Sequence, residues 1–235
     1  MRKNLLKVDL HTHSAEDPEE PIEHTCFELI DKACHLGYDA ISITNHNMIT
    51  YGKYVRHYAR ERGILLIPGA EIDIRGKHIL VVNAEEKVLG ARSFDDLRRL
   101  RSPSSMVVAP HPYFPGGASL LWLMQRNIDV FDAIEFSWFY HRLINFNVFA
   151  MRTAARYELP LLCTSDCHHL EKLGCAYSLV DAEKEAGAII EAIKTGRVEI
   201  AANPLKLLEF SKHGLEHVVG NALGAVGGLL FGEQR

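Results

Sequence analysis

The stretch VDLHTH, residues 8–13, leads from an apolar strand directly into two histidines. Side chains alternate along an extended segment, so His11 and His13 point to the same side and can both reach one metal ion. The segment LLCTSDCHH, residues 161–169, is built in the same way, because Asp166 and His168 follow an apolar run and again lie two positions apart. The two segments predict strands that end in metal-ligand side chains.

Short apolar, β-branched segments alternate along the chain with helical patterns. The predicted strands are residues 7–10, 40–44, 65–68, 78–82, 106–109, 133–136, 161–164 and 176–180. The predicted helices are residues 25–36, 51–62, 93–100, 119–125, 144–157 and 183–195. This alternation predicts parallel strands joined by crossover helices, and the number of units favours a closed or nearly closed α/β barrel of the TIM type over an open sheet.

The barrel pattern accounts for residues 1–202 as a single domain. From residue 203 the pattern changes, and Gly220, Gly224 and Gly228 lie four residues apart in an apolar run. We expect residues 203–235 to form a tail or a helix that packs on this chain or joins it to a second copy in a homo-oligomer. A segment that touches a membrane is the alternative, but the run is too short for stable membrane insertion.

Composition tells against several classes of protein. The chain has 235 residues, 47% of them hydrophobic, a net charge of −4 and a pI near 6.3. It therefore lacks the basic surface that duplex nucleic acid requires. The five cysteines form no CxxC pair, which favours reduced thiols and a cytoplasmic location over a zinc finger or a disulfide framework. The N-terminal residues contain no apolar stretch typical of a signal peptide.

Imidazole and carboxylate side chains lie at the ends of nearly all the predicted strands. In a parallel α/β barrel these ends form one face, where active sites collect. Such nitrogen and oxygen donors suit zinc, manganese or iron, and they exceed what one ion needs. We therefore expect two or three divalent ions (Mn, Zn or Fe) at this face. The candidate ligands are His11, His13, His46, Glu71, His78, His111, Asp166 and His168.

Glu71 is the best candidate for a bridging ligand, since its two oxygens can join ions about 3.5–4 Å apart. Each of the other groups alone has an ordinary explanation: Asp166, for example, could cap a helix. Their shared position after successive strands is what indicates a metal site.

Five segments together resemble the successive motifs of the polymerase and histidinol phosphatase (PHP) family of metal-dependent phosphoesterases. They are VDLHTH (8–13), GYDAISITNHN (37–47), IPGAEI (67–72), APHPY (109–113) and TSDCHHLEKLG (164–174). The resemblance implies a distorted (β/α)7 barrel with a di- or trinuclear site, in which a metal-activated hydroxide attacks a phosphate ester. The implied catalytic residues are His11, His13, Glu71, Asp166 and His168.

The resemblance also implies how the ligands divide among the ions. One ion is held by His11, His13, Glu71 and Asp166. A second ion is held by Glu71, His78 and His111, and a third is held with help from His46 and His168.

Two departures from the family motifs concern the third ion. Family members commonly show Ser-Asp-Gly shortly after the second histidine, whereas this chain has SAEDPEEPIEH at 14–24. Asp17 is the first choice for the missing ligand, with Glu20 and His24 as alternatives, and only two ions bind if none of them reaches the site. The second departure is Asn45, which replaces a carboxylate that could orient His46.

The predicted substrate contacts are Arg75, Arg142 and His169, with an aromatic wall from residues 138–140. We expect the substrate to be a small phosphomonoester or a nucleotide phosphate. One alternative is a hydrolase of the amidohydrolase type, although that class usually bridges its metals with a carbamylated lysine where this chain has Glu71. The other is a non-enzymatic binding module with a vestigial site.

Four further side chains near these motifs have open or lesser roles. Cys163 and Cys167 are expected to be structural thiols. Asp9 is expected to support a ligand histidine rather than bind a metal. Glu135, at a strand end, either lines the pocket or pairs with a neighbour.

Overall fold

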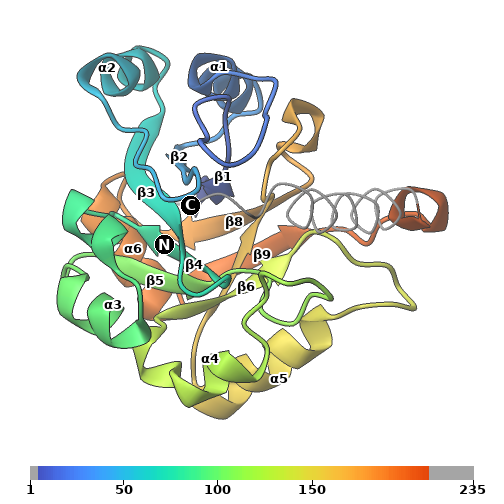
Figure 1. The fold of residues 1–235 in the computed structure, drawn as a ribbon. Helices are drawn as coiled ribbons and strands as arrows, with labels where there is room; N and C mark the ends of the chain where they lie inside the picture. Colours follow the sequence, from blue (N-terminus) through green and yellow to red (C-terminus); the bar gives the residue numbers. More distant parts are fainter. Residues whose placement is uncertain (1–4, 212–235) are drawn as a thin grey trace, which may run out of the picture. The chain divides into compact units, whose positions relative to one another are not determined.

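The computed structural model describes residues 5–211, which belong to two compact units (Figure 1). The larger unit comprises residues up to 138 together with 146–203, and the smaller comprises 139–145 together with residues from 204 onward. The larger unit holds nearly all of the predicted motifs. The predicted division between residues 202 and 203 stays a prediction.

Strands and helices alternate in the larger unit as predicted. The strands are β1 (Leu5–Thr12), β2 (Ala40–Ile43), β3 (Leu65–Asp73), β4 (His78–Val82), β5 (Met106–Ala109), β6 (Ala133–Ser137), β7 (Leu161–Thr164), β8 (Ala176–Asp181) and β9 (Val198–Ala202). The helices are α1 (Cys26–His35), α2 (Lys53–Glu61), α3 (Phe94–Leu100), α4 (Trp122–Arg126), α5 (Asn147–Tyr157) and α6 (Ala186–Lys194). Every predicted element is present, and β9 is an additional strand that the sequence patterns did not indicate.

The nine strands form one sheet in the order β7-β6-β5-β4-β3-β2-β1-β8-β9. This sheet curls into the nearly closed, distorted TIM-like barrel that the motifs imply, so the predicted fold class is confirmed. Where the sheet is not closed by backbone pairing, the side chain of Ser178 in β8 links β8 to β7. Its hydroxyl accepts from the N–H of Cys163 in β7 and donates to the carbonyl of the same residue, both at 2.8 Å.

The prediction that all strands run parallel is wrong. β4 is antiparallel to both β3 and β5, and β8 is antiparallel to β1 and β9. Only residues 74–77 separate β3 from β4, and a parallel crossover needs a dozen or more residues. Arg75 and Gly76 both have positive φ, 57° and 74°, as in the tight turns that suit hairpins.

Three apolar layers hold the barrel together. Leu6, Val8, Ile67 and Leu80 belong to the interior cluster, which also includes Ile189 and Ile193 of α6. The strand members of this cluster lie toward one end of the barrel, so α6 covers that end. The outer face of the sheet packs on α1 and α2 in one region and on α3, α4 and α5 in another. The opposite end of the barrel is left to polar side chains.

A bulge in β1 turns both histidines of the opening motif toward the same side as the apolar strand residues. Asp9 pairs with Ile41 and Thr12 with Ile43, so β1 has one extra residue between the two pairs. An extra residue reverses the alternation of side chains along a strand. Val8 and Leu10 therefore pack in the interior cluster while His11, of opposite parity, also faces into the barrel.

Gly69 in β3 is required by the packing beneath the polar end of the barrel. A Cβ atom there would lie 2.2 Å from the Ser42 hydroxyl oxygen, 2.8 Å from a Thr44 methyl carbon and 3.3 Å from the Val81 carbonyl oxygen. We expect Gly69→Ala to lower the free energy of unfolding by about 1–3 kcal/mol, the usual cost of overpacking. Urea denaturation would measure this. Gly117→Ala is the control, because its Cβ meets nothing within 4 Å, and equal losses in both variants would contradict the packing argument.

The smaller unit holds Phe139 and Tyr140 of the predicted aromatic segment, whereas Trp138 belongs to the larger unit. Leu205 donates its N–H to the carbonyl of Tyr140 at 2.8 Å, and the rings of Phe139 and Phe210 stack with centroids 4.6 Å apart. The glycine-spaced run lies outside the described residues, and an oligomer formed through residues 203–235 stays a prediction. Within the described part of the chain, no helix is long and apolar enough to cross a membrane.

Candidate metal centre

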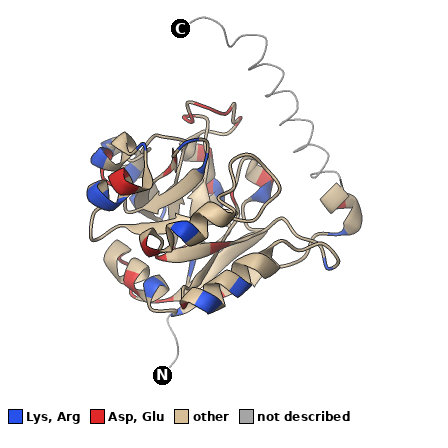
Figure 2. Cartoon of the chain, turned by 60° about the horizontal axis from the view of Figure 1, so that its bottom comes forward, with Lys and Arg blue, Asp and Glu red and all other residues tan. Residues whose placement is uncertain are grey.

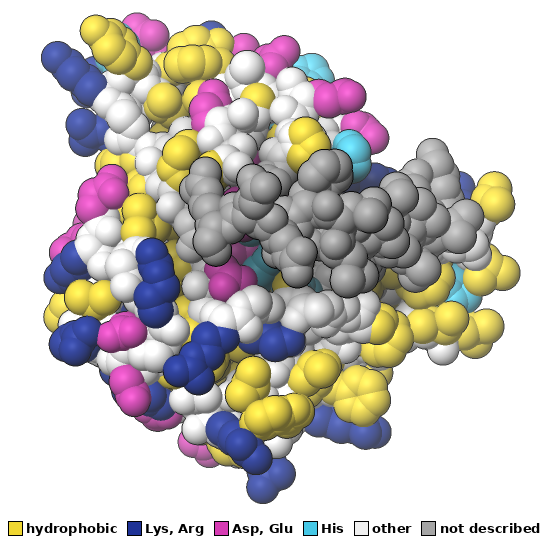
Figure 3. Space-filling model, viewed as in Figure 1, with side chains coloured by type: hydrophobic (Ala, Val, Ile, Leu, Met, Phe, Trp, Pro, Cys, Tyr) yellow, Lys and Arg dark blue, Asp and Glu magenta, His cyan; other side chains and the backbone are white. Residues whose placement is uncertain are grey.

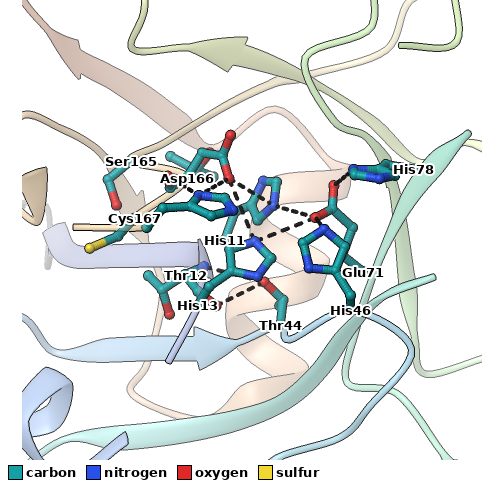
Figure 4. A network of polar contacts seen from close by, with 12 residues as sticks. His11, Thr12, His13, Thr44, His46, Glu71, His78, Ser165, Asp166 and Cys167 are labelled. Carbon is teal, nitrogen blue, oxygen red and sulfur yellow. Dashed lines mark hydrogen bonds and ion pairs between the residues drawn. The ribbon is translucent and has the colours of Figure 1, made fainter. Parts of the chain in front are cut away.

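Five histidine rings lie against the carboxylate of Glu71. Those of His11, His13, His46 and His78 are labelled in Figure 4. Its Oε2 lies 3.3 Å from Nε2 of His11, 3.4 Å from Nε2 of His13 and 3.2 Å from Nε2 of His46. Its Oε1 lies 3.0 Å from Nδ1 of His78 and 3.3 Å from Nε2 of His111. The structure thus brings together ligand candidates that are spread over a hundred residues of sequence.

Asp166 is a second carboxylate against which histidine rings lie. Its Oδ1 lies 3.3 Å from Nε2 of His11, 3.6 Å from Nε2 of His13 and 3.4 Å from Nδ1 of His168. Asp166 and His111 both have positive φ, 47° and 28°, which residues other than glycine rarely adopt. Backbone strain of this kind concentrates at functional sites.

The strand topology explains why these residues share one end of the barrel. His11, Glu71 and Asp166 lie at or just after the carboxyl ends of β1, β3 and β7. His78 begins β4, and because β4 is antiparallel its amino end meets the carboxyl end of β3. His46 is brought to Glu71 by a parallel β-bridge between the two residues.

Four ligand-type atoms at this end are buried and have no hydrogen-bond partner among residues 5–211. They are Nε2 of His11, Nε2 of His13, Oε1 of Glu71 and Oδ1 of Asp166. A buried polar atom without a partner costs about 1–3 kcal/mol, so four of them side by side would be a heavy penalty in an ordinary core. Divalent cations would satisfy all four. The donor set therefore fits a metal centre of more than one ion, and three groups of ligand atoms lie close enough to hold one: His11, His13 and Asp166; His13, Asp17 and His46; and His46, Glu71 and His78.

Glu135 orients His11 from the side away from Glu71. Its Oε1 accepts from Nδ1 of His11 at 2.8 Å and from the Thr164 hydroxyl, and its Oε2 accepts the backbone N–H of His111 at 2.5 Å. A carboxylate on the far nitrogen of a ligand histidine fixes the ring and makes it a better ligand. The sequence left open whether Glu135 lines the pocket or pairs with a neighbour. It pairs with His11, and its position at the end of a predicted strand was the feature that pointed to the site.

The three candidates for the missing third-ion ligand occupy different positions. Asp17 hydrogen-bonds to Nδ1 of His13 at 3.1 Å and to Nδ1 of His46 at 2.9 Å. Glu20 Oε2 lies 3.2 Å from Nε2 of His168, at the more exposed edge of the site. His24 Nε2 donates to the carbonyl oxygen of His13 at 2.9 Å, so this nitrogen is already used away from the cluster.

The carboxylates raise the pKa of the histidines they surround. Burial lowers the pKa of His13, but the contacts of its ring with the carboxylates of Asp166, Asp17 and Glu71 outweigh burial and raise it to about 10. In His46 burial likewise lowers the pKa, and contacts with Glu71 and Asp17 raise it to about 9. Metal ions bind the deprotonated rings, so metal binding would release protons from this site.

Asp9 and the two cysteines lie next to the site but do not enter it. Asp9 Oδ1 accepts the backbone N–H of His11 at 3.4 Å and of Ser165 at 3.2 Å, so Asp9 supports the backbone of a ligand rather than its ring. Burial raises the pKa of the Cys163 and Cys167 thiols, which keeps both protonated. This agrees with the expectation that they are structural thiols.

The predicted substrate contacts are not assembled around the cluster by any described interaction. Arg75 is an exposed residue of the β3–β4 turn, and His169 is exposed beside His168. Arg142 belongs to the smaller unit. All three stay predictions. Lysine and arginine lie mainly on the helices around the sheet (Figure 2), whereas histidine and acidic side chains adjoin one another on the face in Figure 3.

Comparison with known proteins agrees with the motifs. Residues 145–198 match a family model described as PHP-associated. An uncharacterized protein of Methanocaldococcus jannaschii is 25% identical over 173 residues, covering 66% of this chain and 94% of that protein.

Two solved structures share the fold. A two-domain protein from Bacteroides vulgatus, described as containing a predicted PHP-like metal-dependent phosphoesterase, has a TM-score of 0.68 at 20% identity; the match covers 86% of this chain and 66% of that one. A lesion-specific endonuclease from Pyrococcus furiosus has a TM-score of 0.57 at 15% identity, covering 83% of this chain and 57% of that one. The matched PHP-associated segment and the shared barrel are thus similar to the PHP-like phosphoesterases that the motifs resemble.

Proposed function

We propose that this chain is a metal-dependent phosphoesterase that hydrolyses small-molecule phosphate esters at two or three divalent ions. The observation that carries the proposal is the set of four buried ligand atoms of His11, His13, Glu71 and Asp166 that no hydrogen bond satisfies among residues 5–211. Histidine nitrogens together with carboxylate oxygens suit zinc, manganese or iron rather than magnesium or calcium alone. Divalent ions held here would activate water, bind the phosphoryl oxygens and offset charge on the leaving group.

The positions of the side chains indicate which ion each of them would bind. Glu71 faces rings on both of its oxygens, so it is suited to bridge two ions. His11 and His13 stand between Glu71 and Asp166 and would serve the ion between these carboxylates. His78 and His111 would hold the ion on the other side of Glu71.

The outer side of the site would hold the third ion and admit the substrate. The side chains of Asp166 and His168 are 24% and 28% exposed, whereas His11 and His13 are fully buried. A substrate phosphate can therefore reach the cluster from the side of Asp166 and His168. The buried side is closed by the apolar interior of the barrel, which keeps bulk water away from the ligands.

The charge around the mouth favours a small phosphate over a long polyanion. Glu20 contacts His168, and Glu19 accepts from the side-chain amide of Asn47, so two carboxylates stand at the edge of the site. Acidic groups here would repel a nucleic-acid backbone, while a single phosphate could still be held by the ions. This argument supports a phosphomonoester or a nucleotide phosphate as the substrate.

The test is metal analysis of the purified chain followed by assay of the manganese-loaded protein. We expect two or three Mn, Zn or Fe ions per chain and hydrolysis of p-nitrophenyl phosphate. A panel of phosphomonoesters, phosphodiesters and a duplex DNA with an abasic site then identifies the substrate class. Less than one ion per chain after expression in metal-supplemented medium would overturn the metal centre, and turnover of the duplex alone would overturn the small substrate.

A further inference from the structure

Asp17 is surrounded by N–H donors on both of its oxygens. Its side chain is fully buried. Oδ2 accepts the backbone N–H of His46 at 2.8 Å and lies 2.9 Å from Nδ1 of His46 and 3.1 Å from Nδ1 of His13. Oδ1 accepts the backbone N–H of Glu19 at 2.9 Å and of Glu20 at 3.2 Å. A carboxylate offers about four lone-pair directions, so the three backbone donors and two protonated ring nitrogens together would fill them.

The same contacts determine which nitrogen of each ring faces the metal centre. Because Nδ1 of His13 and of His46 both lie against Asp17, the opposite nitrogens, Nε2, point at Glu71, 3.4 and 3.2 Å from its Oε2. The two rings stack with centroids 4.7 Å apart and an angle of 27° between their planes. One carboxylate thus sets the orientation of two rings that come from different strands.

Asn45, the residue that replaces a family carboxylate, does not orient His46. Its side-chain oxygen accepts the N–H of Ser14 at 2.9 Å, and its amide donates to the hydroxyls of Ser14 and Thr50 at 3.0 and 2.9 Å. Asn45 therefore ties two loops together, and the carboxylate beside His46 comes from Asp17 instead.

We propose that Asp17 is a positioning residue of the metal centre, which holds His13 and His46 as Nδ1–H tautomers so that both Nε2 atoms bind the ions. The inference rests on the proposed function, since it assumes that ions occupy the cluster. It replaces the expectation that Asp17 is itself a ligand, and it leaves Glu20, beside His168, as the loop carboxylate free to reach the outer ion.

The first test is nitrogen NMR of the histidine rings in the full chain loaded with zinc. We expect His13 and His46 each to show a protonated Nδ1 and a zinc-bound Nε2. An unprotonated, zinc-bound Nδ1 in either ring would overturn the proposal, because Asp17 would then share an ion with that nitrogen. If the chain binds no zinc, the proposed function fails, while the Nδ1–H signals of the metal-free protein still show whether Asp17 accepts from both rings.

The second test compares Asp17→Asn with Glu16→Gln, an equivalent change in the same loop whose carboxylate accepts from the N–H of Cys26. Loss of an orienting carboxylate typically lowers metal affinity by about 10–100-fold. We expect that loss in Asp17→Asn with the zinc stoichiometry unchanged, together with shifted Nδ1–H signals from His13 and His46. Glu16→Gln should alter neither. Loss of one whole zinc equivalent in Asp17→Asn, with the other sites unaffected, would mean that Asp17 is a ligand.

Discussion

Glu71→Gln should remove at least one metal ion per chain and reduce phosphatase activity on the order of 10³-fold, the scale typical of losing a central electrostatic group in an active site. Glu71 is 1% exposed, and five histidine rings face its two oxygens. Glutamine keeps the shape of the side chain but removes its charge and turns one oxygen into an N–H₂ donor. Elemental analysis and the p-nitrophenyl phosphate assay would measure the two losses.

Cys167→Ala is the matched control for this prediction. Cys167 is also buried and lies between Asp166 and His168 in the sequence, but its thiol donates to the carbonyl oxygen of His169 at 3.2 Å. We expect this variant to keep its metals and nearly all of its turnover. Full metal content and activity in Glu71→Gln would show that Glu71 is not a metal ligand. An equal loss in Cys167→Ala would show that the thiol takes part in the chemistry.

The second large effect should be a loss of stability of the metal-free protein as the pH rises above neutrality. Folding raises the pKa of His13 to about 10 and that of His46 to about 9, from an ordinary value of 6.5. Between these limits the folded state holds protons that the unfolded state has released. The stabilisation is therefore complete below pH 6.5 and is lost as the pH rises toward 9–10, by about 1.4 kcal/mol per pH unit for each such histidine.

Urea denaturation of the EDTA-treated protein at pH 6.5, 7.5 and 8.5 would measure this dependence. The metal-loaded protein should behave differently, because ions replace the protons and its stability should not fall over the same range. His46→Gln should reduce the slope of the metal-free protein, whereas His57→Gln, at a histidine with 55% side-chain exposure on α2, should leave it unchanged. A flat urea midpoint from pH 6.5 to 8.5 would mean that the rings are neutral without metal.

The sequence predicted the elements of the fold well because most of them depend on local patterns. The apolar segments bounded by turn residues correspond to β1 through β8, and the amphipathic patterns to α1 through α6. The direction of β4 was missed, although only residues 69–77 separate the two predicted strands, which is fewer than a parallel crossover needs. β9 was missed because three of its residues are only partly buried and two are exposed, so it lacks the apolar alternation of the other strands.

The candidate site was predictable as a set of residues but not as an arrangement. Histidine and carboxylate side chains at strand ends point to a metal centre, because the barrel brings strand ends together. Which carboxylate oxygen faces which histidine ring could not be predicted from the sequence. That Glu135 serves His11, and that Asp17 serves two rings at once, depends on contacts between residues 29 or more positions apart, apart from the Asp17–His13 pair.

By itself, the sequence determined the alternation of strands and helices and the clustering of metal-ligand side chains at strand ends, because both follow from local periodicity and spacing. Only the tertiary structure decided the direction of β4, the bulge that turns His11 into the barrel, and which side chains lie inside the cluster around Glu71 and which lie beside it. These features depend on strand pairing and on hydrogen bonds formed across the closed barrel, and no local pattern along the chain encodes which partners will meet there.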